Sequence, residues 1–170
     1  MSARISADGL YRYDLRRQML PNDVYCDDDR LAFIMCNPST ADAELDDPTI
    51  RRCKAFAARE GVSLLTVVNL WSYRATDPDD LIAAHRNGID ITGGDEGREW
   101  LLWAIGTSRV VVAWGAVAAK VPGFTERVAM VVDGARQLDG ELLCLGTTKD
   151  GHPRHPLYVK GDAPLTRWQP

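Results

Sequence analysis

The chain has 170 residues, of which 45% are hydrophobic and 26% charged, and its formal net charge is −4. This size and composition are typical of one soluble domain over residues 1–170, and no run approaches the roughly 18 apolar residues that span a bilayer. The acidic balance disfavours a protein that coats nucleic acid without specificity, because neutralising phosphates requires clustered lysine and arginine side chains.

The first residues lack the apolar core of a signal peptide, which predicts a cytoplasmic protein with no membrane partner. The four cysteines are scattered, at Cys26, Cys36, Cys53 and Cys144, and no two form a Cys-x-x-Cys pair. This spacing argues against a zinc or iron–sulfur site and favours reduced thiols in a core. We therefore expect no metal and no cofactor.

The N-terminal segment, about residues 1–30, is expected to form the edge of a sheet. Residues 10–18 alternate in part between polar and apolar side chains, which is typical of an edge strand. An acidic turn is expected over residues 21–30. Residues 31–36 are apolar without alternation, which indicates a strand covered on both faces.

Helices and strands alternate along the middle of the chain. The helix predicted over 48–60 is amphipathic, with Asp47 placed to cap it and Gly61 to end it. Further helices are predicted over 76–85, 95–106 and 124–137, and further strands over 64–70, 109–114 and 141–145. Four buried strands separated by helices predict a three-layer α/β fold, a four-stranded parallel sheet with helices on both faces. The tail, about 147–170, is rich in proline and glycine and is expected to be irregular.

Polar side chains follow every predicted central strand. Because the carboxyl ends of parallel strands share one edge of a sheet, we expect these groups to converge although they are distant in sequence. They are Asn37, Ser39 and Thr40 after the first strand, Asn69, Ser72, Tyr73 and Arg74 after the second, Trp114 after the third, and residues 147–156 after the fourth.

The segment from Asn37 to Thr49 is the leading candidate for the floor of an active site. Asn37-Pro38 ends the first strand, because proline supplies no N–H and restricts the residue before it. Two adjacent carboxylates, Asp46 and Asp47, follow a run of short polar side chains. A plain joint between strand and helix explains the proline but not so many polar groups together.

Asn69 interrupts an otherwise apolar strand. A buried amide without hydrogen bonds costs roughly 1–3 kcal/mol, so this side chain must have a partner. It either satisfies a neighbouring backbone group or uses its paired donor and acceptor to read the edge of a base. The sequence leaves both interpretations open.

His152 and His155 lie beside Lys149 and Arg154 in a segment rich in proline and glycine. This grouping favours an anion or phosphate site, or a donor that stabilises a leaving group. A metal site is less favoured, because the nearby carboxylates have no ligand spacing and are needed for capping. A basic groove is expected if the two termini meet; it would comprise Arg12, Arg16, Arg17, Lys149, Arg154, Lys160 and Arg167.

Several common motifs are absent. The chain contains neither Gly-x-Gly-x-x-Gly nor a P-loop, so the binding of dinucleotides or nucleoside triphosphates has no motif behind it. Gly-x-Ser-x-Gly is absent too, which removes the usual hydrolase nucleophile.

Three strings carry a resemblance that covers nearly the whole chain. They are NPSTADAELDDPTIRRC over 37–53, VNLWSYRATDP over 68–78 and TKDGHPRHPL over 148–157. Together they resemble a bacterial and phage family of uncharacterised domains, number sixteen forty-three in the unknown-function series. That resemblance implies no activity.

The same layout is remotely similar to the uracil-DNA glycosylase superfamily. Members of that superfamily carry a Gly-x-Asn-Pro or Gly-Gln-Asp-Pro motif after the first strand, Leu-Asn after the second and His-Pro-Ser-Pro after the fourth. Here 35–38 (MCNP), 68–69 (VN) and 151–156 (GHPRHP) stand at those places. The resemblance implies a parallel sheet in the order 2-1-3-4. No aspartate occupies the water-activating position, so Asn37 would orient water, and either His152 or His155 matches the catalytic histidine.

These observations favour a domain that recognises a nucleobase or nucleotide, as a DNA or nucleotide N-glycosidase acting on a modified or mismatched base. The expected catalytic residues are Asn37 with Asp46 or Asp47, which hold water, and His152 or His155, which stabilises the departing base anion. The expected substrate contacts are Ser39, Thr40, Asn69 and Trp114, with Arg74, Lys149 and Arg154 on phosphate and Trp71 or Tyr73 stacked on a flipped base.

Two alternatives stay open at this point. One is a module that binds a nucleotide or nucleic acid without chemistry. The other is a small-molecule hydrolase with Asp46 and Asp47 as general bases, because fold does not fix function. The sequence leaves the oligomeric state open.

Overall fold

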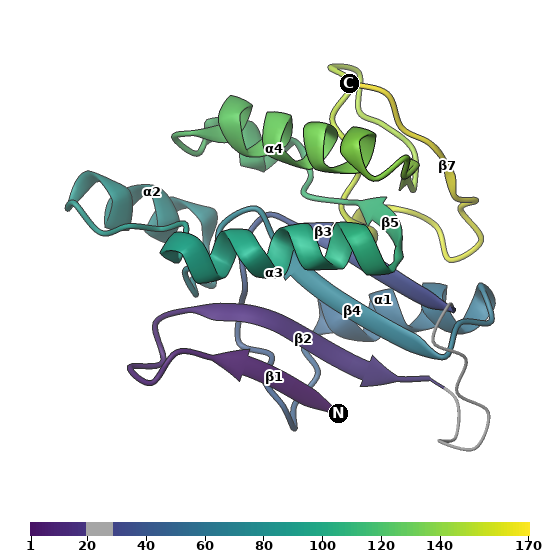
Figure 1. Cartoon of the computed structure of the whole chain (residues 1–170), viewed down its shortest axis with the longest axis horizontal. Helices are drawn as coiled ribbons and strands as arrows, with labels where there is room; N and C mark the ends of the chain where they lie inside the picture. The colour runs from purple at the N-terminus through teal and green to yellow at the C-terminus, as the bar shows by residue number, and fades with distance from the viewer. Residues whose placement is uncertain (20–28) are drawn as a thin grey trace.

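A single mixed sheet runs through the protein, in a computed structural model that describes residues 1–19 and 29–170 (Figure 1). Its order is β1-β2-β4-β3-β5-β6-β7. The inner strands β4, β3, β5 and β6 are parallel to one another, whereas β1, β2 and β7 pair antiparallel with the strands beside them. The strands are β1 (Ser2–Ile5), β2 (Arg12–Gln18), β3 (Arg30–Met35), β4 (Leu64–Asn69), β5 (Arg109–Val112), β6 (Leu142–Cys144) and β7 (Thr166–Arg167).

The prediction of a four-stranded sheet is wrong in the number of strands. The described part of the chain forms seven, because antiparallel strands extend both edges of the parallel core. β1 is only half-buried at alternate residues and β7 has two exposed residues, so neither has an apolar run to signal it. The acidic turn predicted over 21–30 and Cys26 lie almost entirely outside the described residues.

Helices cover both faces of the sheet. α1 (Pro48–Arg59) lies behind the sheet in Figure 1, and α3 (Gly94–Thr107) crosses in front of it. α2 (Pro78–Arg86) and α4 (Phe124–Gln137) pack into the same core layer as α3. Two 3-10 helices, η2 (Ala116–Lys120) and η3 (Pro156–Tyr158), complete the described elements. In the described part of the chain, no helix has the length and apolar character needed to cross a membrane.

β3 is apolar without alternation because both of its faces are covered. Phe33 and Met35 point into the layer that contains Phe56 of α1. Ile34 and Cys36 point into the layer that contains Leu101 of α3, since successive side chains of a strand face opposite ways. The central strand is therefore buried from Leu31 to Met35, and its carboxyl end opens directly onto the loop that begins at residue 37.

The loop between β3 and α1 is held in place by Arg17 of β2, which is fully buried. Arg17 Nε donates to Asp46 Oδ1 at 2.7 Å, and Arg17 Nη2 donates to the carbonyl of Asp42 at 2.6 Å. Lys54 Nζ reaches the other oxygen of Asp46 at 2.8 Å. Burial alone would raise the pKa of Asp46, but these cationic partners lower it below its ordinary value. Asp46 therefore has a structural role, because both of its carboxylate oxygens are paired.

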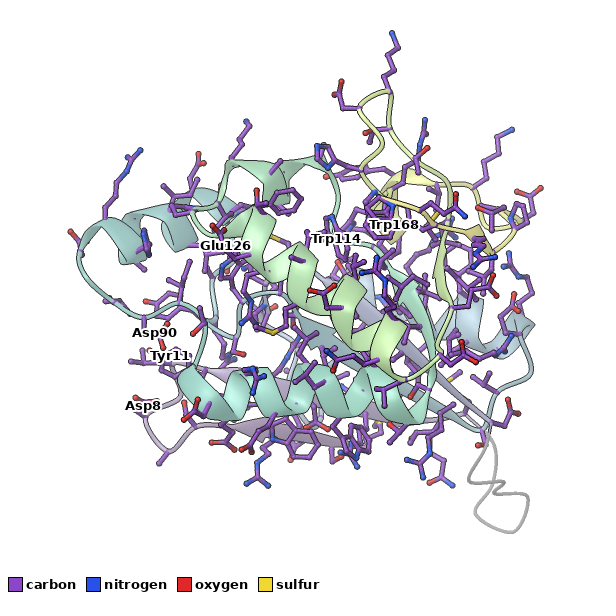
Figure 2. The ribbon with its side chains drawn as sticks, turned by 45° about the horizontal axis from the view of Figure 1, so that its top comes forward. Asp8, Tyr11, Asp90, Trp114, Glu126 and Trp168 are labelled. Atoms are coloured by element: carbon purple, nitrogen blue, oxygen red, sulfur yellow. The ribbon has the colours of Figure 1, made fainter. Side chains whose placement is uncertain are left out.

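The C-terminal tail returns to the sheet through Trp168. Its ring packs edge-on against Trp114, with the ring centroids 5.2 Å apart, and its Nε1 donates to the carbonyl of Gly151 at 3.2 Å (Figure 2). This contact anchors the loop that follows β6. The two termini end on opposite edges of the sheet, so they do not meet and the predicted groove of seven basic residues does not form (Figure 1).

Candidate functional site

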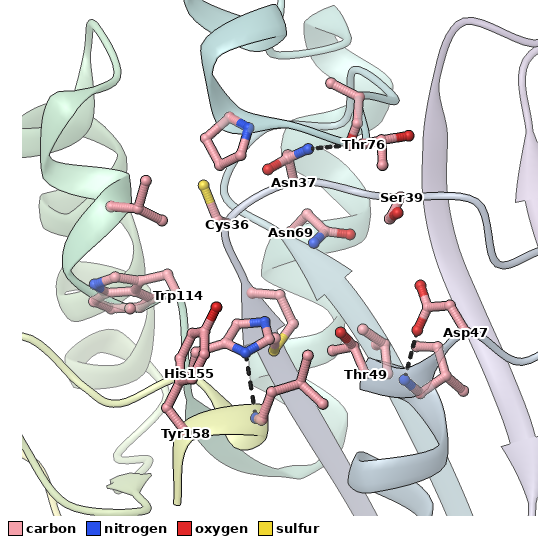
Figure 3. A pocket seen from close by; sticks show the side chains of 18 of the residues that line it. Cys36, Asn37, Ser39, Asp47, Thr49, Asn69, Thr76, Trp114, His155 and Tyr158 are labelled. Carbon is pink, nitrogen blue, oxygen red and sulfur yellow. Dashed lines mark hydrogen bonds between the residues drawn. The ribbon is translucent and has the colours of Figure 1, made fainter.

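A cavity of about 580 Å³ lies at the carboxyl ends of the parallel strands β3, β4 and β5 (Figure 3). Its volume is in the range of pockets for small organic ligands. Seven of the residues predicted from sequence line it: Asn37, Ser39, Asp47, Asn69, Trp114, Arg154 and His155. Arg12, Thr49, Thr148 and Tyr158 add polar groups, and Met35, Cys36, Ile50, Val117 and Leu157 add apolar surface. Groups from distant parts of the chain therefore share one cavity.

Other predicted residues have different surroundings. Trp71, 1% exposed, lies in the hydrophobic core, so it is not available to stack on a base. Tyr73 packs edge-on against Tyr11, with ring centroids 5.9 Å apart, and Tyr11 in turn donates from its hydroxyl to the carbonyl of Asp90 (Figure 2). Arg74 donates to the carbonyl of Gly9 at 3.1 Å. These side chains support the loop after β4 without lining the cavity.

Thr40, Asp46, Lys149 and His152 also lie outside the cavity lining. Thr40 and Lys149 are exposed, and Asp46 is held by Arg17 and Lys54. His152 packs against Phe124, with ring centroids 5.6 Å apart. Of the two histidines that the sequence left as alternatives, only His155 reaches the cavity.

Asn37 has one end of its side-chain amide fixed. Its Nδ2 donates to the carbonyl of Ala75 at 2.7 Å, which ties the loop after β3 to the loop after β4 (Figure 3). The backbone N–H of Ala75 donates to the carbonyl of Pro38 at 2.9 Å and strengthens the same link. No described residue donates to Asn37 Oδ1, so this oxygen is an available acceptor in the cavity lining.

Asn69 lies at the floor of the cavity and is 3% exposed. Its Oδ1 accepts from Arg12 Nη2 at 3.4 Å, so its partner is a guanidinium and not the backbone group that one interpretation expected. Its Nδ2 has no acceptor among residues 1–19 and 29–170 and faces the cavity (Figure 3). Asn69 therefore offers a donor to a ligand.

Arg12 was not identified from sequence as a cavity residue. It lies on β2, whose partial alternation indicated an edge strand, and it was expected in a basic groove between the termini; instead β1 covers that edge and Arg12 is 3% exposed. Burial lowers the pKa of Arg12 to about 10, against a smaller opposite effect of Asp47, and leaves the guanidinium charged at neutral pH. The register of β2 shifts beside Arg12, because Arg4 pairs with Asp14 and Ile5 with Arg12, so the alternation of the strand does not indicate where Arg12 points.

His155 is held as a neutral hydrogen-bond donor. It caps η3 by accepting at Nδ1 from the backbone N–H of Leu157, at 3.3 Å. This hydrogen bond assigns the proton of the neutral ring to Nε2, which faces the cavity (Figure 3). Burial lowers the pKa of His155 to about 4, although the Asp47 carboxylate acts in the opposite direction.

This burial predicts a pH dependence of stability. The unfolded chain binds the His155 proton at the ordinary pKa of about 6.5, and the folded protein binds it only near pH 4. The stability that the neutral His155 ring contributes is therefore fully present above about pH 6.5 and is lost as the pH falls towards 4. Compared with a His155→Gln variant, the native protein should lose up to about 3 kcal/mol of unfolding free energy between about pH 7 and about pH 4. Urea unfolding at both pH values measures this, and equal losses in the two proteins would contradict it.

Asp47 supplies a carboxylate to the cavity and also begins α1. Its Oδ1 accepts from the backbone N–H of Ile50 at 2.8 Å, which confirms the predicted N-cap. Cys36 also belongs to the lining, but burial raises the pKa of its thiol to about 12, so it stays protonated at neutral pH. The cavity thus has an available carboxylate and no activated thiol.

One wall of the cavity depends on Gly115. Its φ of 74° and ψ of 166° belong to a region that side chains other than glycine rarely adopt, and its N–H donates to the carbonyl of Pro153 at 3.0 Å. A Cβ at this position would lie 3.4 Å from the Cβ of His155. The close approach of these two segments places Trp114 and His155 on neighbouring walls. In the described part of the chain, no group of three or more histidine, cysteine or acidic side chains is placed to hold a metal ion.

The fold and the cavity define a mixed α/β protein with a candidate ligand site at the carboxyl ends of its parallel strands. The chain belongs to DUF1643, a family described as proteins of unknown function, whose family model matches residues 12–157. This match includes every cavity residue named above except Tyr158. No curated protein and no solved structure matches the chain.

Proposed function

We propose that this cavity binds a nucleobase of a nucleotide or nucleic acid and hydrolyses its N-glycosidic bond. One observation carries the proposal: an unpaired amide donor of Asn69, an imidazole donor of His155 and a free acceptor of Asn37 surround the same cavity. A base has donors and acceptors on its edge, so such a set suits base recognition.

The reaction requires different groups on the two sides of the scissile bond. Positive charge builds on the sugar while negative charge builds on the leaving base, so a donor must meet the base and a water molecule must approach the sugar. A neutral imidazole with its proton on Nε2 can stabilise the anion by donating a hydrogen bond without changing its own charge. We assign this role to His155.

The water molecule would be held by Asn37 and Asp47. Asn37 Oδ1 has no donor among the described residues, and Asp47 is the only acidic side chain in the cavity lining. Asp46, the other acidic candidate, is excluded from this role in our proposal because its two oxygens pair with Arg17 and Lys54. A carboxylate close to the sugar also favours the positive charge that develops there.

The exposed aromatic side chain of Tyr158 is available to stack on the base, although the sequence did not predict it for this role. Tyr158 stands at the mouth of the cavity with 79% of its surface exposed, whereas Trp114, although it belongs to the lining, is fully buried in the core. Tyr158 also lies 5.6 Å, between ring centroids, from His155 (Figure 3). Arg154 is exposed on the same side and would meet a phosphate.

A second candidate is a module that binds a nucleotide without cleaving it. The observation in its favour is that one oxygen of Asp47, the only carboxylate that the described residues bring to the lining, already accepts the capping hydrogen bond of α1. This engagement weakens Asp47 as a general base.

The two candidates differ in whether a free base is produced. Nucleotides and single-stranded and duplex oligonucleotides carrying uracil, hypoxanthine, mismatches and bulky modified pyrimidines would be incubated with the protein, and released bases and abasic sites measured by chromatography. We expect release from at least one substrate and its loss in Asn37→Ala, because the water would no longer be oriented. Binding without release favours the module. The absence of both binding and release would contradict both candidates.

A further inference from the structure

We propose that Arg12 pairs with an oxyanion of the ligand, a phosphate or a carboxylate, so that the cavity selects an anionic molecule over its neutral counterpart. The nucleotide nature of that ligand rests on the proposed function. The pairing with an oxyanion does not, because it follows from the surroundings of Arg12 alone.

Arg12 is a buried cation whose guanidinium forms no ion pair with the described residues, although the carboxylate of Asp47 acts on it from a greater distance. No carboxylate of the described residues lies within ion-pair distance of its guanidinium, and its Nε is buried without any hydrogen-bond partner. Its remaining contacts are to neutral groups: Nη1 donates to the carbonyl of Ala41 at 2.8 Å, and Nη2 makes the 3.4 Å contact with Asn69. A buried charge that stays uncompensated is strongly unfavourable, so a partner from outside the chain is expected.

Arg17 shows how this fold satisfies a buried arginine that has a structural role. It lies on the same strand as Arg12 and is fully buried, yet each of its three guanidinium nitrogens has a partner. Nε pairs with Asp46, and both Nη atoms donate to backbone carbonyls. Arg12 has no such set, and it lines the cavity whereas Arg17 does not.

The charges around the cavity favour an anion. Its lining contains two cations, Arg12 and Arg154, and one carboxylate, Asp47, with His155 neutral. Asp47 raises the pKa of Arg12, but Arg74 and Arg17 lower it, so further positive charges act at this place beside the one carboxylate of the lining. The planar fork of a guanidinium matches two oxygens of a phosphate or carboxylate.

Binding should be measured by calorimetry at low ionic strength with four kinds of probe: nucleoside 5′-monophosphates, the matched nucleosides, inorganic phosphate and a pyrimidine carboxylate. We expect an anionic probe to bind at least about tenfold more tightly than its neutral counterpart, a difference typical of one charge-assisted pair. Arg12→Met should abolish that preference and Arg12→Lys should keep part of it. Arg16→Met, on the same strand but outside the cavity, should keep all of it.

The four probes also separate the possible sources of the anion. A preference for monophosphates or for phosphate alone assigns a phosphate, and a preference for the pyrimidine carboxylate assigns a carboxylate. The proposal is overturned if neutral nucleosides bind as tightly as every anionic probe, if Arg12→Met binds like the native protein, or if no probe binds. Anion binding that depends on Arg12 without any base release would refute the glycosidase and leave this inference intact.

A measurement without ligand guards against a variant that fails to fold. Removal of an uncompensated buried charge should leave the melting temperature of Arg12→Met equal to or above that of the native protein. A marked decrease would identify Arg12 as a structural arginine, like Arg17, and would overturn the inference.

Discussion

Replacing Arg17 with methionine should lower the free energy of unfolding by about 3–5 kcal/mol, the cost of breaking a buried ion pair from one side. Arg17 is fully buried, and its partner Asp46 would be left largely buried with only Lys54 to compensate it. The variant also loses the hydrogen bond to the carbonyl of Asp42, so the loop that ends at the cap of α1 should loosen.

Urea unfolding followed by circular dichroism measures this loss. Arg136→Met is the matched control, because Arg136 forms an exposed pair with Asp133 at 3.3 Å, and such pairs contribute at most about 1 kcal/mol. A loss for Arg17→Met no larger than that of the control would contradict the view that Arg17 fixes the loop.

Substituting His155 with glutamine should reduce the rate of base release by about 10²–10³-fold, the usual effect of removing one donor from a developing anion. His152→Gln should leave the rate unchanged, because His152 packs against Phe124 outside the cavity. The two substitutions are chemically identical and lie three residues apart. A difference between their rates of base release would therefore come from the position of the histidine and not from the residue type.

Single-turnover rates with saturating protein separate this effect from weaker binding. We expect the loss in His155→Gln to persist at saturation, as it must if the donor acts on the transition state. Equal losses in both variants would show that the loop, and not the imidazole of His155, determines the rate.

The parts of the fold that could be predicted are those with strong local signals. β3 and β4 are continuous apolar runs, and α1 has both an amphipathic pattern and the Asp47 cap, so strands and helix lie close to their expected bounds. β1 and β7 were missed because short strands at the edge of a sheet bury little and need no apolar run. The number of strands in the sheet was therefore wrong.

The residues of the candidate site also fall into those that the sequence could predict and those that it could not. Asn37, Asn69 and His155 were predicted because polar residues after buried strands must share an edge of a parallel sheet. Arg12 was missed because it comes from an antiparallel strand, for which that argument gives no position. Trp71 was expected to stack on a ligand, but its place in the core depends on packing across the sheet, which local sequence does not reveal.

The central claim is that a nucleotide binds in this cavity between Asn69 and His155. An NMR titration of the ¹⁵N-labelled protein with nucleoside monophosphates tests it most directly, because each chain carries its own internal controls. We predict that the side-chain amide of Asn69 and the imidazole of His155 shift together, with one dissociation constant, while the imidazoles of His85 and His152 stay unchanged. Shifts confined to residues outside the cavity, with Asn69 and His155 unmoved, would contradict the account.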